Sequence, residues 1–244
     1  MPKLPVKYFK TVTEYAKYNW SGAIDKLYPV VKTVTKDFTR TDPVYVRIGE
    51  DGEPEIHYTM TQADGASYFA DMDLGNATIY VHGGEKLNNV QGMFMRTKIR
   101  RVNLDSIGSS TSLYLFNSTS WTIKDVTIVD LNAFDTSKVT DFVQSFYYNQ
   151  SMTDFPAFDL SAVTDMSSAF VQMIKLAKFH ATGMKVSFNL SSTALKHDAI
   201  LEVFNNLGEV DKTAGITLTL GSAKLALMSD EEKAIATGKG WVLA

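Results

Sequence analysis

Hydrophobic and polar positions recur at an interval of 24 residues in the middle of the chain. Residues 134–141 read Phe-Asp-Thr-Ser-Lys-Val-Thr-Asp, and residues 158–165 read Phe-Asp-Leu-Ser-Ala-Val-Thr-Asp. Phe146 and Phe170 follow at equivalent positions. A period of about 20–29 residues is typical of leucine-rich-type solenoids, in which each unit buries its apolar edge only by stacking on its neighbours. The pattern therefore predicts a repeat scaffold.

Weaker copies of this pattern extend toward the N-terminus. Residues 77–81 are expected to form a first strand, residues 87–94 a short helix and residues 99–104 its return strand. A degenerate unit follows over residues 113–129. In the two clear copies, the Thr-Asp pairs are expected to cap short helices by accepting hydrogen bonds from their first N–H groups.

A last unit covers residues 196–208 and leads into a C-terminal cap from about residue 209. Its apolar residues at 200, 203, 204 and 207 share one helical face, and Gly208 is expected to end the helix. The cap should contain a strand at 216–221 and a helix that begins with a Ser229-to-Glu232 capping box. The aromatic residues predicted to form the repeat core are Phe94, Phe116, Phe146, Phe170 and Phe204.

Residues 1–65 lack the repeat and are expected to form a small α+β region that attaches or assembles the molecule. A helix starting at Thr11 or Thr13 is followed by a hairpin around Asp51-Gly52. The helix has four large side chains that form either a local core or an apolar surface for a partner. These side chains are Tyr15, Tyr18, Trp20 and Ile24. The predicted organisation is thus residues 1–65 followed by an α/β solenoid of short strands and short helices over residues 66–244.

The composition of the chain narrows the range of possible functions. The chain has 244 residues, of which 45% are hydrophobic and 21% charged, and a formal net charge of −3. These values favour neither disorder nor a surface for nucleic acid. The absence of cysteine excludes a disulfide framework and thiol-based metal or catalytic sites. Neither a signal peptide nor an apolar stretch long enough for a membrane span is evident, so we expect no membrane association and no export by the usual route.

Candidate catalytic and metal sites find little support. The four histidines, His57, His82, His180 and His197, are scattered and form no metal-binding motif. Residues 71–76 resemble the start of a calcium loop but lack later ligands. The basic residues between 96 and 101 are interrupted by apolar ones, as on the solvated face of a strand. We therefore predict no catalytic residue, no cofactor and no metal.

The two clear units, with the motif Phe-Asp-x-Ser-x-Val-Thr-Asp and a Phe five residues later, resemble the BspA-like leucine-rich-repeat family. That family occurs in bacterial surface proteins and phage structural proteins. The stretch from Leu190 to Trp241 is similar to the C-terminal cap of gut-bacterial and phage members, so the resemblance covers roughly residues 75–244. It implies an extended binding or assembly surface and no catalytic residues.

Three functions are compatible with this reading. The first is a phage virion protein of the head, collar or tail that binds other virion proteins, itself, or a host-surface protein or glycan. The alternative is a bacterial cell-surface adhesin of the same repeat family, which should have an export signal. The third is a carbohydrate-active enzyme on a solenoid, which would need two carboxylates at glycosidase separation.

Overall fold

The computed structural model describes residues 44–49, 56–60, 78–82, 90–95, 100–104, 107, 111 and 130–244. Several predictions lie outside these residues. They concern the N-terminal aromatic residues Tyr15, Tyr18 and Trp20 with Ile24, the degenerate unit with Phe116, and the acidic loop at 71–76.

A five-stranded sheet forms the N-terminal part of the described structure. The strands β1 (Val44–Gly49) and β2 (Ile56–Met60) pair in antiparallel orientation, which confirms the predicted hairpin. On its other side β1 pairs with β3 (Thr78–His82), also antiparallel. The strands β4 (Arg101–Leu104) and β5 (Asp130–Leu131) continue the sheet in parallel orientation, giving the order β2-β1-β3-β4-β5.

The hairpin belongs to the same sheet as the first strands of the repeat region. Residues 45–49 of β1 pair with residues 78–82 of β3, one residue against one. The predicted division between residues 1–65 and 66–244 therefore runs through a single sheet. Cutting the chain there would remove β1 and expose the N–H and C=O groups along one edge of β3.

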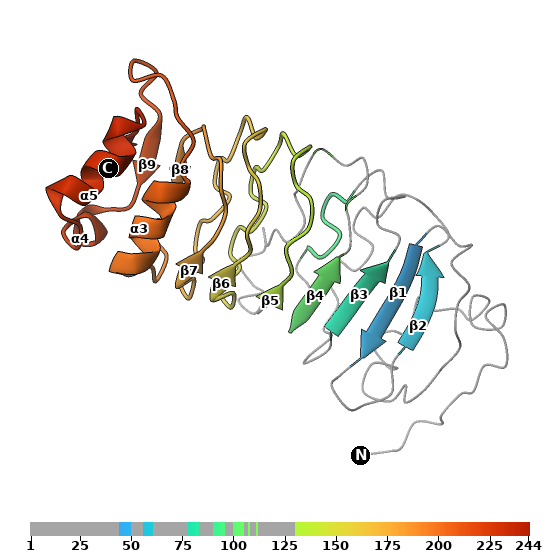
Figure 1. The fold of residues 1–244 in the computed structure, drawn as a ribbon. Coiled ribbons are helices and arrows are strands. Elements are labelled where there is room, and N and C mark those ends of the chain that lie inside the picture. Colours follow the sequence, from blue (N-terminus) through green and yellow to red (C-terminus); the bar gives the residue numbers. More distant parts are fainter. Residues whose placement is uncertain are drawn as a thin grey trace, which may run out of the picture.

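Two further strands continue the row at the interval of the sequence repeat. The strands β6 (Asp154–Phe155) and β7 (Lys178–Phe179) are parallel and pair Phe155 with Phe179. Figure 1 shows β1 to β7 lying side by side along the long axis of the molecule. We call residues 130–153 unit A and residues 154–177 unit B.

In residues 90–95 and in both clear copies, the chain between the strands forms successive turns, so the short helices predicted there are wrong. In unit A, the N–H groups of Phe142, Gln144, Phe146 and Tyr148 donate to carbonyls of unit B at 2.9–3.0 Å. Between them, the N–H groups of Ser145 and Tyr147 donate to carbonyls three residues back within unit A, and that of Val143 donates to the Asp141 side chain. An α-helix would direct all of these donors to its own carbonyls four residues back.

Left-handed residues lie within the stretch whose N–H groups alternate in direction. Gln144 and Tyr148 in unit A have φ values of 52° and 62°, and Ser168 and Gln172 occupy the equivalent places in unit B with 58° and 63°. Residues other than glycine seldom adopt this conformation, because Cβ then crowds the backbone. The repeat of the sequence is therefore also a repeat of an uncommon backbone conformation.

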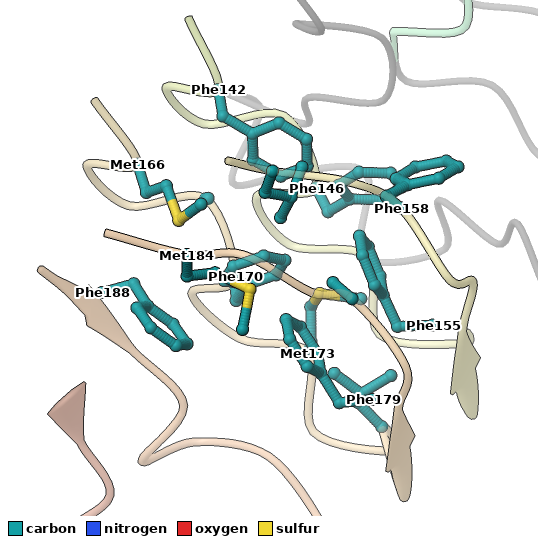
Figure 2. Close-up of a cluster of buried hydrophobic side chains, with 14 of the residues drawn as sticks. Phe142, Phe146, Phe155, Phe158, Met166, Phe170, Met173, Phe179, Met184 and Phe188 are labelled. Carbon is teal, nitrogen blue, oxygen red and sulfur yellow. The ribbon is translucent and has the colours of Figure 1, made fainter. Parts of the chain in front are cut away.

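Aromatic side chains fill the interior of the two units. The ring of Phe155 lies 4.9 Å from that of Phe146, 5.3 Å from that of Phe170 and 5.0 Å from that of Phe179. Figure 2 shows these rings between the turns of successive units, together with Phe142. The predicted core residues Phe94, Phe146, Phe170 and Phe204 are at most 1% exposed. Phe155 joins Phe146 to Phe170 and so connects the two units.

Three strands and three helices close the C-terminal end. The helix α3 (His197–Asn206) buries Ile200, Val203 and Phe204. The strands β8 (Phe188–Asn189), β9 (Thr217–Thr219) and β10 (Val242–Leu243) form a parallel sheet of order β10-β9-β8. Two more helices, α4 (Ser222–Leu225) and α5 (Asp230–Gly238), cover this end (Figure 1).

Of the two predictions about helix ends, one is confirmed and the other is wrong. The capping box of α5 is confirmed, because the Ser229 side chain accepts from the Glu232 N–H and the Glu232 carboxylate accepts from the Ser229 N–H. Gly208 does not end α3, since Leu207 is the capping residue and is extended. Gly208 is needed for close packing instead: a Cβ there would lie 2.8 Å from Lys185 Cγ and 2.9 Å from the Met184 carbonyl oxygen.

Replacing Phe155 with Ala should lower the free energy of unfolding by about 3–5 kcal/mol, because it removes a fully buried ring that joins two units. The exposed Ile174 of unit B is the control, and Ile174→Ala should cost under about 1 kcal/mol. Urea unfolding of the two variants measures both values. Equal costs would show that Phe155 is not part of a packed core.

The left-handed backbone at Ser168 predicts a reversed preference between Gly and Ala. Ser168→Gly should be more stable than Ser168→Ala by about 1 kcal/mol, because Gly adopts positive φ without strain. At the neighbouring Ser167, which is not left-handed, Ala should be more stable than Gly by about 0.5–1 kcal/mol. Both comparisons remove the hydroxyl equally, and thermal melts of the four variants test them. The same order at both positions would contradict the alternating conformation.

Candidate binding surface

A row of polar side chains lies on the outside of units A and B. It consists of four positions from each unit, at an interval of 24 residues, and all eight side chains are exposed. We call it the polar ladder. Its members are Asp135, Ser137, Thr140 and Asp141 in unit A, and Asp159, Ser161, Thr164 and Asp165 in unit B.

The aspartates of the ladder shape the local backbone. One carboxylate oxygen of Asp159 accepts from the Ser161 N–H at 2.9 Å, and Asp135 makes the same bond to Ser137 at 2.9 Å. Asp165 accepts from the Ser167 N–H at 2.8 Å. These are Asx turns, in which the side chain mimics a backbone carbonyl. The Thr-Asp pairs were expected to cap helices, and their aspartates do accept N–H groups, but of turns.

Hydrogen bonds also hold two of the ladder aspartates, Asp135 and Asp165, ionised. The bonds from the Ser137 hydroxyl and N–H lower the pKa of Asp135 below its ordinary value. The bonds from the Ser167 side chain and N–H lower the pKa of Asp165 in the same way. The lowered pKa means that both groups are negatively charged at neutral pH.

Bonds between the units fix the ladder in register. The carbonyl oxygen of Thr140 accepts from the Thr164 N–H at 2.8 Å and from its hydroxyl at 3.0 Å. Asp141 and Asp165 pair in parallel orientation, and the Thr136 hydroxyl donates to the Asp159 carbonyl at 2.7 Å. Five of the eight ladder residues therefore have backbone that is bonded to a neighbouring unit: Thr140, Asp141, Asp159, Thr164 and Asp165.

The chemistry of the ladder is acidic and hydrogen-bonding. It presents four carboxylates and four hydroxyls, and its members include no cationic side chain; Lys138 is exposed between them in sequence. Such a surface can bind cationic groups and hydrogen-bond donors.

A third turn of the same kind escaped the sequence comparison. Residues 188–191 read Phe-Asn-Leu-Ser, and the Asn189 side chain accepts from the Ser191 N–H at 2.8 Å. Thr193 takes the place of Val163, and its buried hydroxyl donates to the Leu190 carbonyl at 2.6 Å. This Phe-Asn-Leu-Ser motif can be read in the sequence, but it begins 30 residues after Phe158 and so falls outside the 24-residue interval.

The structure also shows where the histidines and two of the clustered basic residues lie. His180 and His197 lie beside carboxylates near α3, whereas His57 and His82 lie in β2 and β3. Arg100 and Arg101 of the basic cluster are half-buried at the start of β4. Within the described residues, no three side chains of His, Asp or Glu are grouped to hold a metal ion.

Comparison with known proteins provides no relative, because no family model, no curated protein and no solved structure matches this chain. The resemblance to the BspA-like family stays a prediction from the repeat motif. In the part of the chain that the structure describes, none of the helices has the length and apolar character needed to span a membrane.

Gly183 supports the Asx turn of Asp159 and should not tolerate a side chain. It has a φ of +78°, and an added Cβ would lie 2.9 Å from Ser161 Cβ and 3.2 Å from Asp159 Oδ1. We expect Gly183→Ala to cost about 2–4 kcal/mol, as the sum of backbone strain and overpacking.

Gly215 provides the control for this prediction. Its φ is +66°, but no atom lies within 4 Å of the added Cβ. Gly215→Ala should therefore cost only the backbone strain, about 1 kcal/mol. Chemical unfolding of both variants compares the costs, and equal values would show that Gly183 does not pack against the ladder.

Proposed function

We propose that this chain is a non-enzymatic structural and binding protein, built as a leucine-rich-repeat-like solenoid whose polar ladder contacts a partner. The observation that supports this is that all eight ladder side chains are exposed while the backbone of five of these residues is held by bonds between units. A surface already fixed in its binding geometry loses little conformational entropy when a partner docks. Side chains repeated from unit to unit provide the extended contact surface that repeat proteins use.

The ladder's composition indicates the chemistry of the partner. Its carboxylates and hydroxyls complement a protein surface rich in Lys, Arg and other hydrogen-bond donors. Complementary charge speeds association and selects against partners of the wrong sign. We therefore expect the partner to present a basic contact surface.

Within this proposal the chain is a component of a phage virion. The support is the resemblance of the repeat units and the C-terminal stretch to phage structural members of the BspA-like family. The basic partner is then another virion protein or a host-surface protein. Residues 1–65 attach the molecule to the particle or to a second copy, through the apolar residues Tyr15, Tyr18, Trp20 and Ile24.

Fractionation tests the location. An antibody against the chain should detect it in density-purified particles of the phage that encodes it. Detection only in the bacterial envelope fraction would overturn the virion assignment and favour a surface adhesin.

A charge-neutral ladder tests the contact surface. Replacing the four ladder aspartates with Asn keeps an oxygen acceptor for each Asx turn but removes four negative charges. The melting temperature should change little, whereas incorporation into particles should fall by about tenfold or more. The control neutralises four exposed carboxylates of the cap in the same way: Glu209, Asp211, Asp230 and Glu231.

The control should incorporate as the unmodified chain does. Equal incorporation of the ladder variant and the control would show that the ladder is not the contact surface.

A further inference from the structure

We propose that two imidazoles, each bridging a pair of carboxylates, fasten helix α3 to unit B and to the cap, and that they form a pH-sensitive clasp. The clasp consists of His180 with Asp154 and Glu202, and of His197 with Asp198 and Glu232. These residues come from β6, α3 and α5 and from the chain directly after β7.

The first bridge joins unit B to α3. His180 follows β7 directly, and its Nε2 lies 3.0 Å from Asp154 Oδ1 on β6. Its Nδ1 lies 2.6 Å from Glu202 Oε1 on α3. Lys178 holds the other oxygen of Asp154 at 3.2 Å. One imidazole therefore connects two strands of the row to the helix that follows them.

The second bridge joins α3 to α5. His197 is the first residue of α3, and its Nδ1 lies 2.8 Å from Asp198 Oδ1. Its Nε2 lies 2.9 Å from Glu232 Oε1 on α5. The other oxygen of Glu232 accepts from the Ser229 N–H in the capping box at 2.8 Å. The carboxylate that receives His197 is thus already fixed by the start of α5.

Each bridge makes both of its hydrogen bonds to ionised carboxylates only when its imidazole is protonated. An ionised carboxylate only accepts hydrogen bonds, and a neutral imidazole has a single N–H. An imidazole with a carboxylate oxygen at each nitrogen satisfies both contacts only as an imidazolium. Loss of the proton would leave an unprotonated imidazole nitrogen facing a carboxylate oxygen in each bridge.

The charges around the second bridge favour this protonated form. The bonds to Asp198 and then to Glu232 raise the pKa of His197 above its ordinary value of 6.5. The stabilisation from His197 is therefore fully present below about pH 6.5 and is lost as pH rises through the raised pKa. The bond from the Ser229 N–H lowers the pKa of Glu232 below its ordinary value of 4.5, so the contribution of that group is lost only in acid.

Other charged groups near the clasp are Lys178 beside Asp154, Lys196 next to His197, and the pair of Lys233 with Asp230 at 3.3 Å on α5. The clasp is additional to apolar attachment, because α3 also buries Ile200, Val203 and Phe204. Deprotonation should therefore loosen α3 locally while the units stay folded.

Hydrogen exchange on the full chain tests the clasp. Protection factors, corrected for intrinsic exchange, are compared at about pH 5.5 and about pH 8.5. We expect protection in α3 and at the start of α5 to fall by about tenfold at the higher pH, while units A and B change less than about twofold. The double variant His180→Gln/His197→Gln should lose this pH dependence, and His82→Gln in β3 should retain it.

Two outcomes would overturn the proposal. One is equal protection of α3 at both pH values in the unmodified chain, a result that does not depend on any variant folding. The other is the same pH response in the double variant as in the unmodified chain. Glu202→Gln provides a milder change at the first bridge, and it should weaken the pH response without abolishing it.

Discussion

Backbone hydrogen bonds between unit A and unit B are the constraint on which the rest of the described structure depends. Every second N–H from Phe142 to Tyr148 donates to a carbonyl of the next unit, and Gln144 and Tyr148 within this stretch are left-handed. A helix would use the same donors internally and leave each unit unconnected. The strain of the left-handed residues is thus offset by bonds that bring equivalent residues into register.

That register places the apolar side chains on the inside and the polar ones on the outside. Leu131, Phe155 and Phe179 form one interior row, and the ring of Phe155 stacks on that of Phe179 with an interplanar angle of 13°. The same register stacks the Asx turns of Asp135 and Asp159 on the outer surface. Core and ladder are therefore two consequences of one backbone arrangement, and a change that shifts the register disturbs both.

The ends of the stack are closed in different ways. At the N-terminal side the antiparallel hairpin of β1 and β2 pairs with β3. At the other side α3 replaces the turns, and imidazole–carboxylate contacts join it to its neighbours in addition to apolar burial. The ladder is held by backbone bonds between units and by Asx turns of aspartates, whereas the cap contains two imidazole–carboxylate bridges, so a rise in pH above neutrality should act on the cap more than on the proposed contact surface.

The sequence by itself determined the 24-residue period, the hairpin, the α5 capping box and the burial of Phe146 and Phe170, because these features depend on local chemistry and on the spacing of apolar residues. Only the tertiary structure decided that the units contain turns rather than helices, since apolar spacing does not reveal whether an N–H will find its acceptor in its own unit or the next. Tertiary structure also decided the role of Gly208 and the partners of His180 and His197. Apart from Asp198, the residues involved lie 22 to 35 positions away in the chain and become neighbours only when the units stack.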